Sequence, residues 1–356
     1  AKKKLIVFGV EIVVIVAMIA VLYFVMKQPD NSGYSYVEIK AEEVIPSEVQ
    51  QKQIEKQQQA EEKGDPVPQY LNIALFGVDA LTDKQLYRGS RSDCTMIASV
   101  NLETYEVKLV SVYRDTYLNL SDDTYEKCNG AYSYGGAPQA VKMLNMNLDM
   151  DITKFITVGY RGLSEAIDAL GGVYIDVNQG ELEYINSYQQ AVIEVLKQDS
   201  YTPITKTGYQ LVNGVQAAAY CRIRYCDNDF VRTTRQREVL LSMQDQAKKA
   251  SAATLIQIFK EITDDIYTSF EDSEILEFLP KIAEYKVVAN EGFPQMDKLN
   301  PSVSIASKGS CVVPLDLVTN VEWLHKFLFE DEDYEVTSTV KEISARIESD
   351  AAPYIR

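Results

Sequence analysis

An apolar run of 22 residues, residues 5–26, lies near the N-terminus and is interrupted by a single charge, Glu11. At about 1.5 Å rise per residue, a helix of this length spans the hydrocarbon core of a bilayer, which is about 30 Å thick. A cleaved signal peptide has a shorter apolar core and a small-residue cleavage site. The Lys-Gln-Pro-Asp sequence at residues 27–30 is not such a site. The sequence therefore predicts one retained transmembrane helix.

Three lysines at positions 2–4 precede this run, and the positive-inside rule places such basic flanks in the cytoplasm. We therefore expect a cytoplasmic stub at residues 1–4, a single crossing of the cell membrane at residues 5–26, and an extracellular catalytic domain. Residues 27–69 are mostly polar, rich in Gln, Glu and Lys between 48 and 63, and end in Gly-Asp-Pro-Val-Pro at 64–68. This composition predicts an extracellular linker with a helical stalk and a stiff hinge.

The net charge of −17 and the isoelectric point near 4.6 exclude nucleic acid as a partner, because nucleic-acid binding needs a basic face. The arginines are nevertheless clustered. Of eleven arginines, nine lie between residues 88 and 237, and five of these lie between residues 222 and 237. Such clustering in an acidic chain indicates a site for a particular anion, with a solvated charged face as the alternative.

From residue 70 onward, β-rich apolar runs alternate with segments of helical spacing. The runs predict strands at residues 72–79, 95–102, 106–113, 155–159, 173–177 and 311–314, and a tight turn makes the second and third an antiparallel pair. Helices are predicted at residues 138–147, 163–170, 212–220, 233–250, 272–285 and 317–329. Helices between strands cover both faces of a sheet, so we expect one α/β domain at residues 70–331, a three-layer α-β-α fold with a mixed central sheet. Residues 332–356 are predicted to be a mobile acidic tail.

Several common catalytic systems lack their residues in this chain. His325 is the one histidine, and no Gly-x-Ser-x-Gly motif accompanies it. No P-loop and no dinucleotide glycine motif is present. The five cysteines contain no Cys-x-x-Cys pair and no zinc-ligand spacing. We therefore expect a structural role for His325 and free buried thiols, with disulfide pairing left open.

Arginines and carboxylates gather instead where predicted strands end. They are Asp79, Arg88, Arg91, Asp93, Arg114, Asp115, Arg222, Arg224, Asp227, Asp229, Arg232 and Arg235. Arg222 and Arg224 face one side of an extended segment, while Arg232 and Gln236, four apart, share a helix face. Guanidinium groups bind phosphate in bidentate fashion, and two carboxylates with phosphate oxygens and water suit Mg²⁺. The pattern therefore predicts a phosphate site with a metal, and a network of structural Arg–Asp pairs is the alternative.

Seven segments in one order resemble the LytR–CpsA–Psr family of cell-wall ligases. They are FGVD (76–79), RGSRSDCTMI (88–97), VSVYRDTYL (110–118), KCNGAYSYGG (127–136), FITVGYRGLSEAIDALGGVYIDV (155–177), LVNGVQAAAYCRIRY (211–225) and DNDFVRTTRQREVL (227–240). The resemblance covers about residues 70–330, and seven segments in the family's order are far more specific than any one segment. Cys94, Cys128 and Cys221 depart from the family's pattern and look like tolerated core substitutions.

The family's members move a glycopolymer from a polyprenyl-pyrophosphate lipid to peptidoglycan, with a divalent metal. The resemblance therefore implies a phosphotransferase for an anionic glycopolymer, of teichoic-acid, capsule or similar type, acting outside the cell. The implied ligands of Mg²⁺, or of another divalent cation such as Mn²⁺, are Asp79 and Asp93. The implied pyrophosphate ligands are Arg91, Arg114, Arg222, Arg224, Arg232 and Gln236.

The implied reaction is attack of an acceptor hydroxyl on the glycan-bearing phosphorus, with the lipid monophosphate leaving. Positioning and charge stabilisation dominate such transfers. The residues expected to be catalytic are Arg91, Arg114, Arg222 and Arg224, together with Asp115 and Asp229 as candidate bases by placement alone.

Two other functions remain open on the sequence. A non-catalytic sensor or scaffold would bind the same lipid pyrophosphate without turnover and without needing the metal. A hydrolase of the same lipid would differ from the transferase in its acceptor, which would be water.

Overall fold

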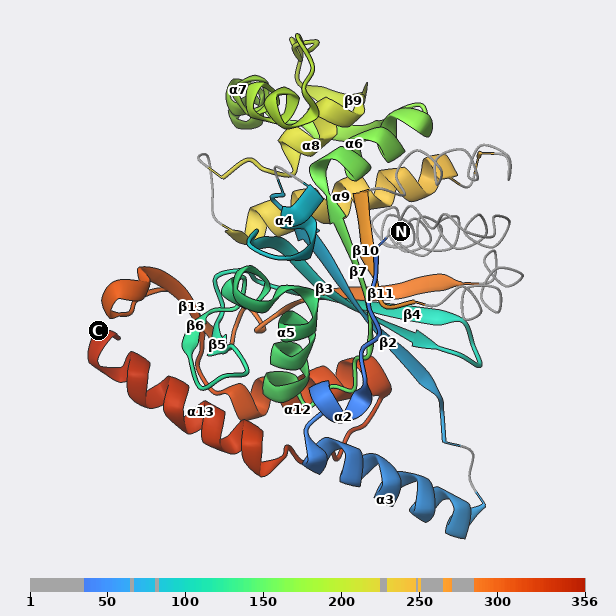
Figure 1. The fold of residues 1–356 in the computed structure, drawn as a ribbon, viewed down its shortest axis with the longest axis vertical. Coiled ribbons are helices and arrows are strands. Elements are labelled where there is room, and N and C mark those ends of the chain that lie inside the picture. The colour runs from blue at the N-terminus through green and yellow to red at the C-terminus, as the bar shows by residue number, and fades with distance from the viewer. Residues whose placement is uncertain are drawn as a thin grey trace. The chain divides into compact units, whose positions relative to one another are not determined.

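The computed structural model describes residues 35–64, 67–80, 83–224, 229–247, 249–250, 265–270 and 285–355. A mixed central sheet (Figure 1) contains, in order, β1 (Ser35–Tyr36), β10 (Ile266–Thr268), β7 (Lys154–Gly159), β2 (Tyr70–Val78), β3 (Ser92–Asn101), β4 (Glu106–Val112) and β11 (Lys286–Phe293). The chain forms two compact units. Unit 1 comprises residues 1–37, 77–86 and 156–289, and unit 2 comprises residues 38–76, 87–155 and 290–356.

The sheet in unit 2 is covered on both faces. β3 and β4 form the antiparallel pair that the sequence predicts, in the register Met96↔Ser111. Residues 95–100 of β3 are all buried, and consecutive strand residues point to opposite faces. Helix α5 (Gly130–Leu148) lies against β3, and α12 (Leu317–Phe329) lies against β4. A mixed sheet with flanking helices fits the predicted three-layer α/β fold.

The expectation of a mobile tail is wrong, because most of the segment after residue 331 is helical and packed. Helix α13 (Ser338–Ala351) buries Val340, Ile343 and Ile347, an apolar stripe at helical spacing, and runs beside α12 (Figure 1). Its N-cap is Thr337, whose Oγ1 accepts the Val340 N–H and donates to Asp149. The acidic residues of this segment led to the prediction of a tail, although the apolar stripe is present in the sequence.

Unit 2 also contains two further helices, two 3-10 helices (labelled η) and two two-stranded sheets among its described residues. These are α2 (Ala41–Val44), α3 (Ser47–Lys63), the pair β5 (Tyr117–Asn119) and β6 (Tyr125–Lys127), the pair β12 (Leu299–Ser304) and β13 (Ser310–Pro314), η4 (Ala306–Lys308) and η5 (Ala352–Tyr354). Helix α3 lies where a helical stalk is predicted. Gln53 and Lys56 on this helix contact Asp151 and Asp331, so α3 packs on the unit.

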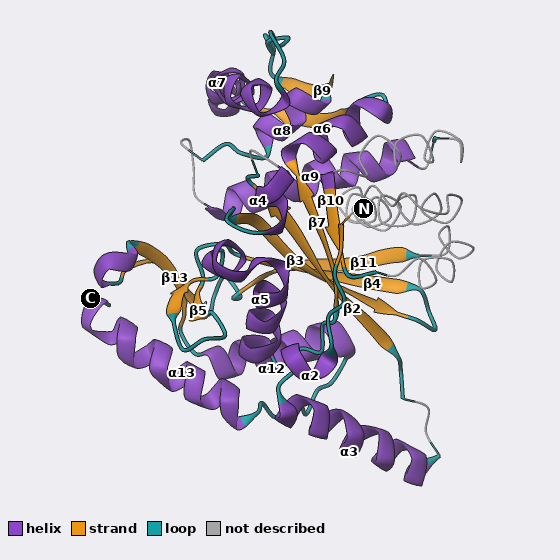
Figure 2. Ribbon diagram, in the orientation of Figure 1, coloured by secondary structure: helices purple, strands orange, loops and turns teal. Residues whose placement is uncertain are grey.

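Unit 1 contains the mixed part of the sheet and a group of helices. β1 runs parallel to β10, and β10 runs antiparallel to β7. Helices α6 (Tyr160–Ala169), α7 (Gln179–Leu196) and α8 (Gly214–Tyr220) lie against one another (Figure 2). Helix α9 (Asp229–Ala247) covers β8 (Val173–Val177), which pairs with β9 (Gly208–Val212). Helix α7 was not predicted from the sequence, although Asn178 and Glu181 form a capping box at its start. Among the residues that the structure describes, α4 (Asp83–Tyr87) is a further short helix.

Within the described ranges, no helix combines the length and the apolar character needed to cross a membrane. The predicted transmembrane helix at residues 5–26 lies outside those ranges, as do residues 272–284 of the helix predicted at 272–285.

Close packing of α6 on α8 requires glycine at position 214. A Cβ there would lie 2.0 Å from the Ser164 carbonyl oxygen, and the Gly214 N–H donates to Asp168 Oδ1 at 2.7 Å. We expect Gly214→Ala to lower the free energy of unfolding by about 1–3 kcal/mol through overpacking, measured by urea titration. Gly159→Ala, whose added Cβ meets only ordinary contacts from 3.8 Å, is the control. Equal stabilities of Gly214→Ala and the wild type would contradict the packing argument.

Candidate active site

The predicted site residues are found in both units, and in unit 2 the structure brings Asp93, Arg114 and Asp115 together. Unit 1 contains Asp79, Arg222, Arg224, Arg232 and Gln236, and unit 2 contains Arg91, Asp93, Arg114 and Asp115. Arg91 is exposed just before β3. Asp229 is the first residue of α9, and its side chain lies outside the described part of the structure.

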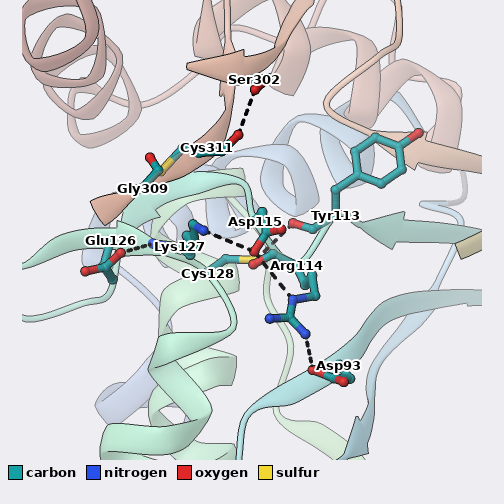
Figure 3. Close-up of polar contacts among 11 residues, drawn as sticks. Asp93, Tyr113, Arg114, Asp115, Glu126, Lys127, Cys128, Ser302, Gly309 and Cys311 are labelled. Carbon is teal, nitrogen blue, oxygen red and sulfur yellow. Dashed lines mark hydrogen bonds and ion pairs between the residues drawn. The ribbon is translucent and has the colours of Figure 1, made fainter. Parts of the chain in front are cut away.

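The Arg114 cluster in unit 2 consists of Asp93, Arg114, Asp115 and Lys127 (Figure 3). The Arg114 side chain is 8% exposed; its Nη1 donates to Asp93 Oδ1, and its Nε donates to Asp115 Oδ1 at 3.4 Å. The β3–β4 pair ends at Met96↔Ser111, three residues from both Asp93 and Arg114. The antiparallel pair therefore brings the two side chains to the same end of the sheet, where they form an ion pair.

Lys127 belongs to this cluster, and the sequence analysis missed it. Its Nζ lies 3.7 Å from Asp115 Oδ1. It is the last residue of β6, where it pairs with Tyr117 of β5. Asp115 thus contacts two cationic side chains, those of Arg114 and Lys127, and this arrangement allows the Asp115 carboxylate to orient Arg114. A signal was present in the sequence, because Lys127 begins one of the seven segments that resemble the family.

Backbone contacts hold the segment that carries Arg114. The Cys128 thiol donates to the carbonyl oxygens of Tyr113 and Arg114, at 3.2 and 3.4 Å (Figure 3). The Cys128 N–H donates to the Thr116 carbonyl at 2.8 Å, and the Val312 N–H donates to the Asp115 carbonyl at 2.9 Å. A thiol that donates is protonated, so Cys128 acts as a structural donor.

The described cysteines are free thiols: Cys94, Cys128, Cys221 and Cys311. Cys94 is half-buried and the other three are buried, so the expectation of free buried thiols holds for those three. Burial raises the pKa of the Cys311 thiol to about 11, so it stays neutral and is a poor nucleophile. Cys226 lies outside the described residues.

The arginine turn, residues 220–224 in unit 1, begins at Tyr220, the last residue of helix α8. The Arg222 N–H donates to the Ala219 carbonyl, so Arg222 lies in a turn and the predicted extended segment is wrong there. Ile223 is fully buried, whereas Arg222 is half-buried and Arg224 is exposed. The Arg222 guanidinium lies 4.7 Å from the centre of the Tyr160 ring. Its Nη1 is buried and makes no hydrogen bond to the described residues. A buried guanidinium N–H without an acceptor is costly, so this atom is available to an acceptor on a ligand, such as a phosphate oxygen.

Helix α9 contributes Arg232 and Gln236, which are four residues apart and therefore share a helix face. Arg232 is 1% exposed and Gln236 is half-buried. The next arginine, Arg235, is also buried and is bound to Glu181 at 2.8 Å.

The two predicted metal ligands, Asp79 and Asp93, are half-buried aspartates in different units. Asp79 directly follows β2, and Asp93 is bound by Arg114. Within the described ranges, no group of three or more His, Cys, Asp or Glu side chains is arranged to hold a metal. Mg²⁺ often takes one or two protein carboxylates and completes its shell with water and substrate phosphate. The two aspartates therefore fit Mg²⁺ in donor type, with Arg114 competing for Asp93.

Two relatives match about half of the chain. It is 27% identical over 202 residues to the polyisoprenyl-teichoic acid–peptidoglycan teichoic acid transferase TagT of Bacillus subtilis, which covers 56% of the chain and 59% of TagT. It is also 30% identical over 207 residues to TagU of Enterococcus faecalis, which is likewise described as a polyisoprenyl-teichoic acid–peptidoglycan teichoic acid transferase. This match covers 56% of the chain and 62% of TagU. The chain thus spans less than two-thirds of each relative's length.

A solved structure, TagT bound to LIIa-WTA, has a similar fold: the TM-score is 0.53 at 20% identity, over 80% of this chain and 91% of that one. The LytR_cpsA_psr family model matches residues 34–306, well over half of the 356 residues. The match includes both the Arg114 cluster and the arginine turn. The chain is a member of the LytR_cpsA_psr family.

Proposed function

We propose that this chain is a phosphotransferase that moves an anionic glycopolymer from a polyprenyl-pyrophosphate carrier to peptidoglycan outside the cell. The observation that carries the proposal is the buried Nη1 of Arg222, which has no acceptor among the described residues although a phosphate oxygen would complete it. Relatives named as teichoic acid transferases support the choice of reaction. The solved structure of TagT bound to LIIa-WTA supports the choice of ligand.

The arginines bind the pyrophosphate in this proposal. Arg222, held against the Tyr160 ring, offers a preorganised guanidinium edge. Its partners in binding are Arg91, Arg114, Arg224, Arg232 and Gln236. Fixed cations aimed at developing charge lower the barrier because they need no reorganisation during the reaction.

The reaction forms a P–O bond between an acceptor hydroxyl of peptidoglycan and the glycan-bearing phosphorus. The bond from that phosphorus to the bridging oxygen breaks, and polyprenyl monophosphate leaves with the bond's electron pair. The hydroxyl proton passes to a base. Asp229 is our candidate base, because the Asp115 carboxylate already contacts Arg114 and Lys127 and suits a positioning role.

In this proposal Asp79 and Asp93 hold Mg²⁺ or Mn²⁺. A bound divalent cation would neutralise phosphate charge. Arg114 would then hold Asp93 through one carboxylate oxygen, leaving the other available to the metal.

The proposed location is the outer face of the cell membrane. Residues 5–26 would cross the bilayer, with residues 1–4 in the cytoplasm, and would keep the domain near its lipid substrate.

Release of polyprenyl monophosphate by the full chain in detergent tests the proposal. The substrates are a polyprenyl-pyrophosphate glycan and peptidoglycan fragments, with Mg²⁺ or EDTA. We expect release that requires the metal and is lost in Arg222→Ala. Tight lipid binding without release of polyprenyl monophosphate would favour the sensor. Release at the same rate in EDTA as in Mg²⁺ would remove the metal from the proposal.

Replacing Arg222 by Lys is expected to slow release about tenfold, because Lys keeps the charge and loses the planar fork. Arg346→Lys is the matched control, since Arg346 also lies over a tyrosine ring, that of Tyr125. Initial rates measured side by side check the effect. Wild-type rates in Arg222→Lys would show that a single positive charge suffices there.

A further inference from the structure

Arg235 is a buried arginine to which the proposed binding chemistry assigns no role. It lies on α9, one residue before Gln236, and is 2% exposed. Its Nε donates to Glu181 Oε1 at 2.8 Å, and its Nη1 donates to the carbonyl oxygen of Ile223 at 3.0 Å. Two edges of one guanidinium group thus bind a carboxylate and a main-chain carbonyl.

The carbonyl that Arg235 binds belongs to the arginine turn. Ile223 separates Arg222 from Arg224, so fixing its carbonyl fixes the peptide units that carry both arginines. Arg235 also lies 5.7 Å from the ring centre of Tyr220, the first residue of the turn. Arg235 therefore contacts two residues of the turn, Tyr220 and Ile223.

Two further contacts anchor the partners of Arg235. Glu181 accepts the Asn178 N–H through its second oxygen at 2.8 Å, which places it at the start of α7. Tyr220 donates its hydroxyl to Glu238 Oε2 at 2.8 Å, and Glu238 Oε1 accepts the Asp176 N–H of β8 at 3.0 Å. These contacts join α7, α8, α9 and β8 around the arginine turn.

We propose that Arg235 is a positioning residue, which holds the Ile223 carbonyl so that Arg222 and Arg224 are presented together to the pyrophosphate. The inference rests on the proposed function, because it assumes that the arginine turn binds pyrophosphate. The planar fork is essential to this role, since a lysine ammonium cannot reach the carboxylate and the carbonyl in the same geometry. Arg235 itself needs no contact with the ligand.

Arg235→Lys tests the inference, because it retains the charge opposite Glu181 and removes the forked geometry. We expect about tenfold weaker binding of geranylgeranyl pyrophosphate to the full chain in detergent, measured by calorimetry, with a cooperative melting transition retained. Arg237→Lys is the matched control on the same helix, since Arg237 donates to the hydroxyl of the exposed Thr234. We expect it to bind as the wild type does.

A double-mutant cycle separates positioning from general loss of stability. If Arg235 acts through the turn, the loss caused by Arg235→Lys shrinks in an Arg222→Lys background, because the two changes damage one unit. Losses that add in full, or wild-type affinity in Arg235→Lys, overturn the inference. If Arg235→Lys does not fold, the double variant E181Q/R235M replaces it in the double-mutant cycle. This variant removes both charges of the buried ion pair, so neither charge is left buried without its partner.

Binding of geranylgeranyl pyrophosphate by the wild type distinguishes a failure of the proposed function from a failure of the inference about Arg235. If it does not bind geranylgeranyl pyrophosphate, the proposed function and the inference fall together. If it binds and Arg235→Lys binds equally well, the inference alone fails and the pyrophosphate site stands.

Discussion

Arg114→Ala is expected to lower the free energy of unfolding by about 3 kcal/mol and to reduce transfer by at least about a hundredfold. The stability loss arises because the substitution leaves Asp93 and Asp115 without the cation that joins them. The expected stability loss is at the lower end of the range for breaking a buried ion pair, because the Asp93 side chain is 22% exposed. The loss of transfer arises because Arg114 is one of the proposed pyrophosphate ligands. Urea unfolding and product release measure the two effects separately.

The double variant D93N/R114A separates stability from catalysis at this site. Removing the Asp93 charge as well should recover part of the stability, because an unpaired carboxylate no longer remains. It should recover none of the transfer. Arg346→Ala, which breaks the exposed pair with Asp350, is the control and is expected to change neither property measurably. Transfer at the wild-type rate in Arg114→Ala would remove Arg114 from the proposed site.

Stability is expected to fall by about 3 kcal/mol between about pH 7 and pH 4 because of His325 alone, at about 1.4 kcal/mol per pH unit. Burial lowers the pKa of His325 from 6.5 to about 4. Its Nε2 lies 3.0 Å from the Leu148 carbonyl oxygen, and its ring is stacked on Tyr334 at 3.6 Å. The folded chain therefore keeps this imidazole neutral at a pH where the unfolded chain has already protonated it.

The sign follows from proton binding. Between pH 6.5 and about 4 the unfolded state binds more protons at His325, so the stabilisation is complete above 6.5 and is lost as the pH falls. Burial raises the pKa of nearby Asp149, so as the pH falls the folded state binds a proton at Asp149 before the unfolded state does. Protonation of Asp149 therefore raises stability as the pH falls, opposite to the effect of His325. Comparing urea unfolding of the wild type and His325→Gln across this range isolates the histidine. Parallel stability curves for the two proteins would contradict the prediction.

The part of the site that follows from strand pairing could be predicted from the sequence. Two β-rich apolar runs joined by a tight turn predict the β3–β4 pair, and the end of that pair at Met96↔Ser111 lies three residues from both Asp93 and Arg114. Hydrophobic periodicity likewise locates α12 and most of α5. These features depend on residues close together in the chain, which is where pattern analysis is strongest.

The parts that were missed depend on contacts between distant segments. Arg235 meets Glu181 across 54 residues, and Lys127 meets Asp115 by way of the β5–β6 turn. No local pattern distinguishes these side chains from solvated charges. The helices α7 and α13 were missed for a different reason, because their apolar stripes and caps are present in the sequence and were outweighed by polar composition.

The mass of the peptidoglycan acceptor tests the central claim most directly. Fragments would be incubated with the full chain in detergent, Mg²⁺ and a polyprenyl-pyrophosphate glycan, and then analysed by mass spectrometry. We predict that the acceptor gains the mass of the glycan plus its linking phosphate, in the wild type and in Arg237→Lys but not in Arg222→Ala. An unchanged acceptor, with free glycan phosphate in solution or with no lipid consumed, would contradict transfer and leave a hydrolase or a sensor.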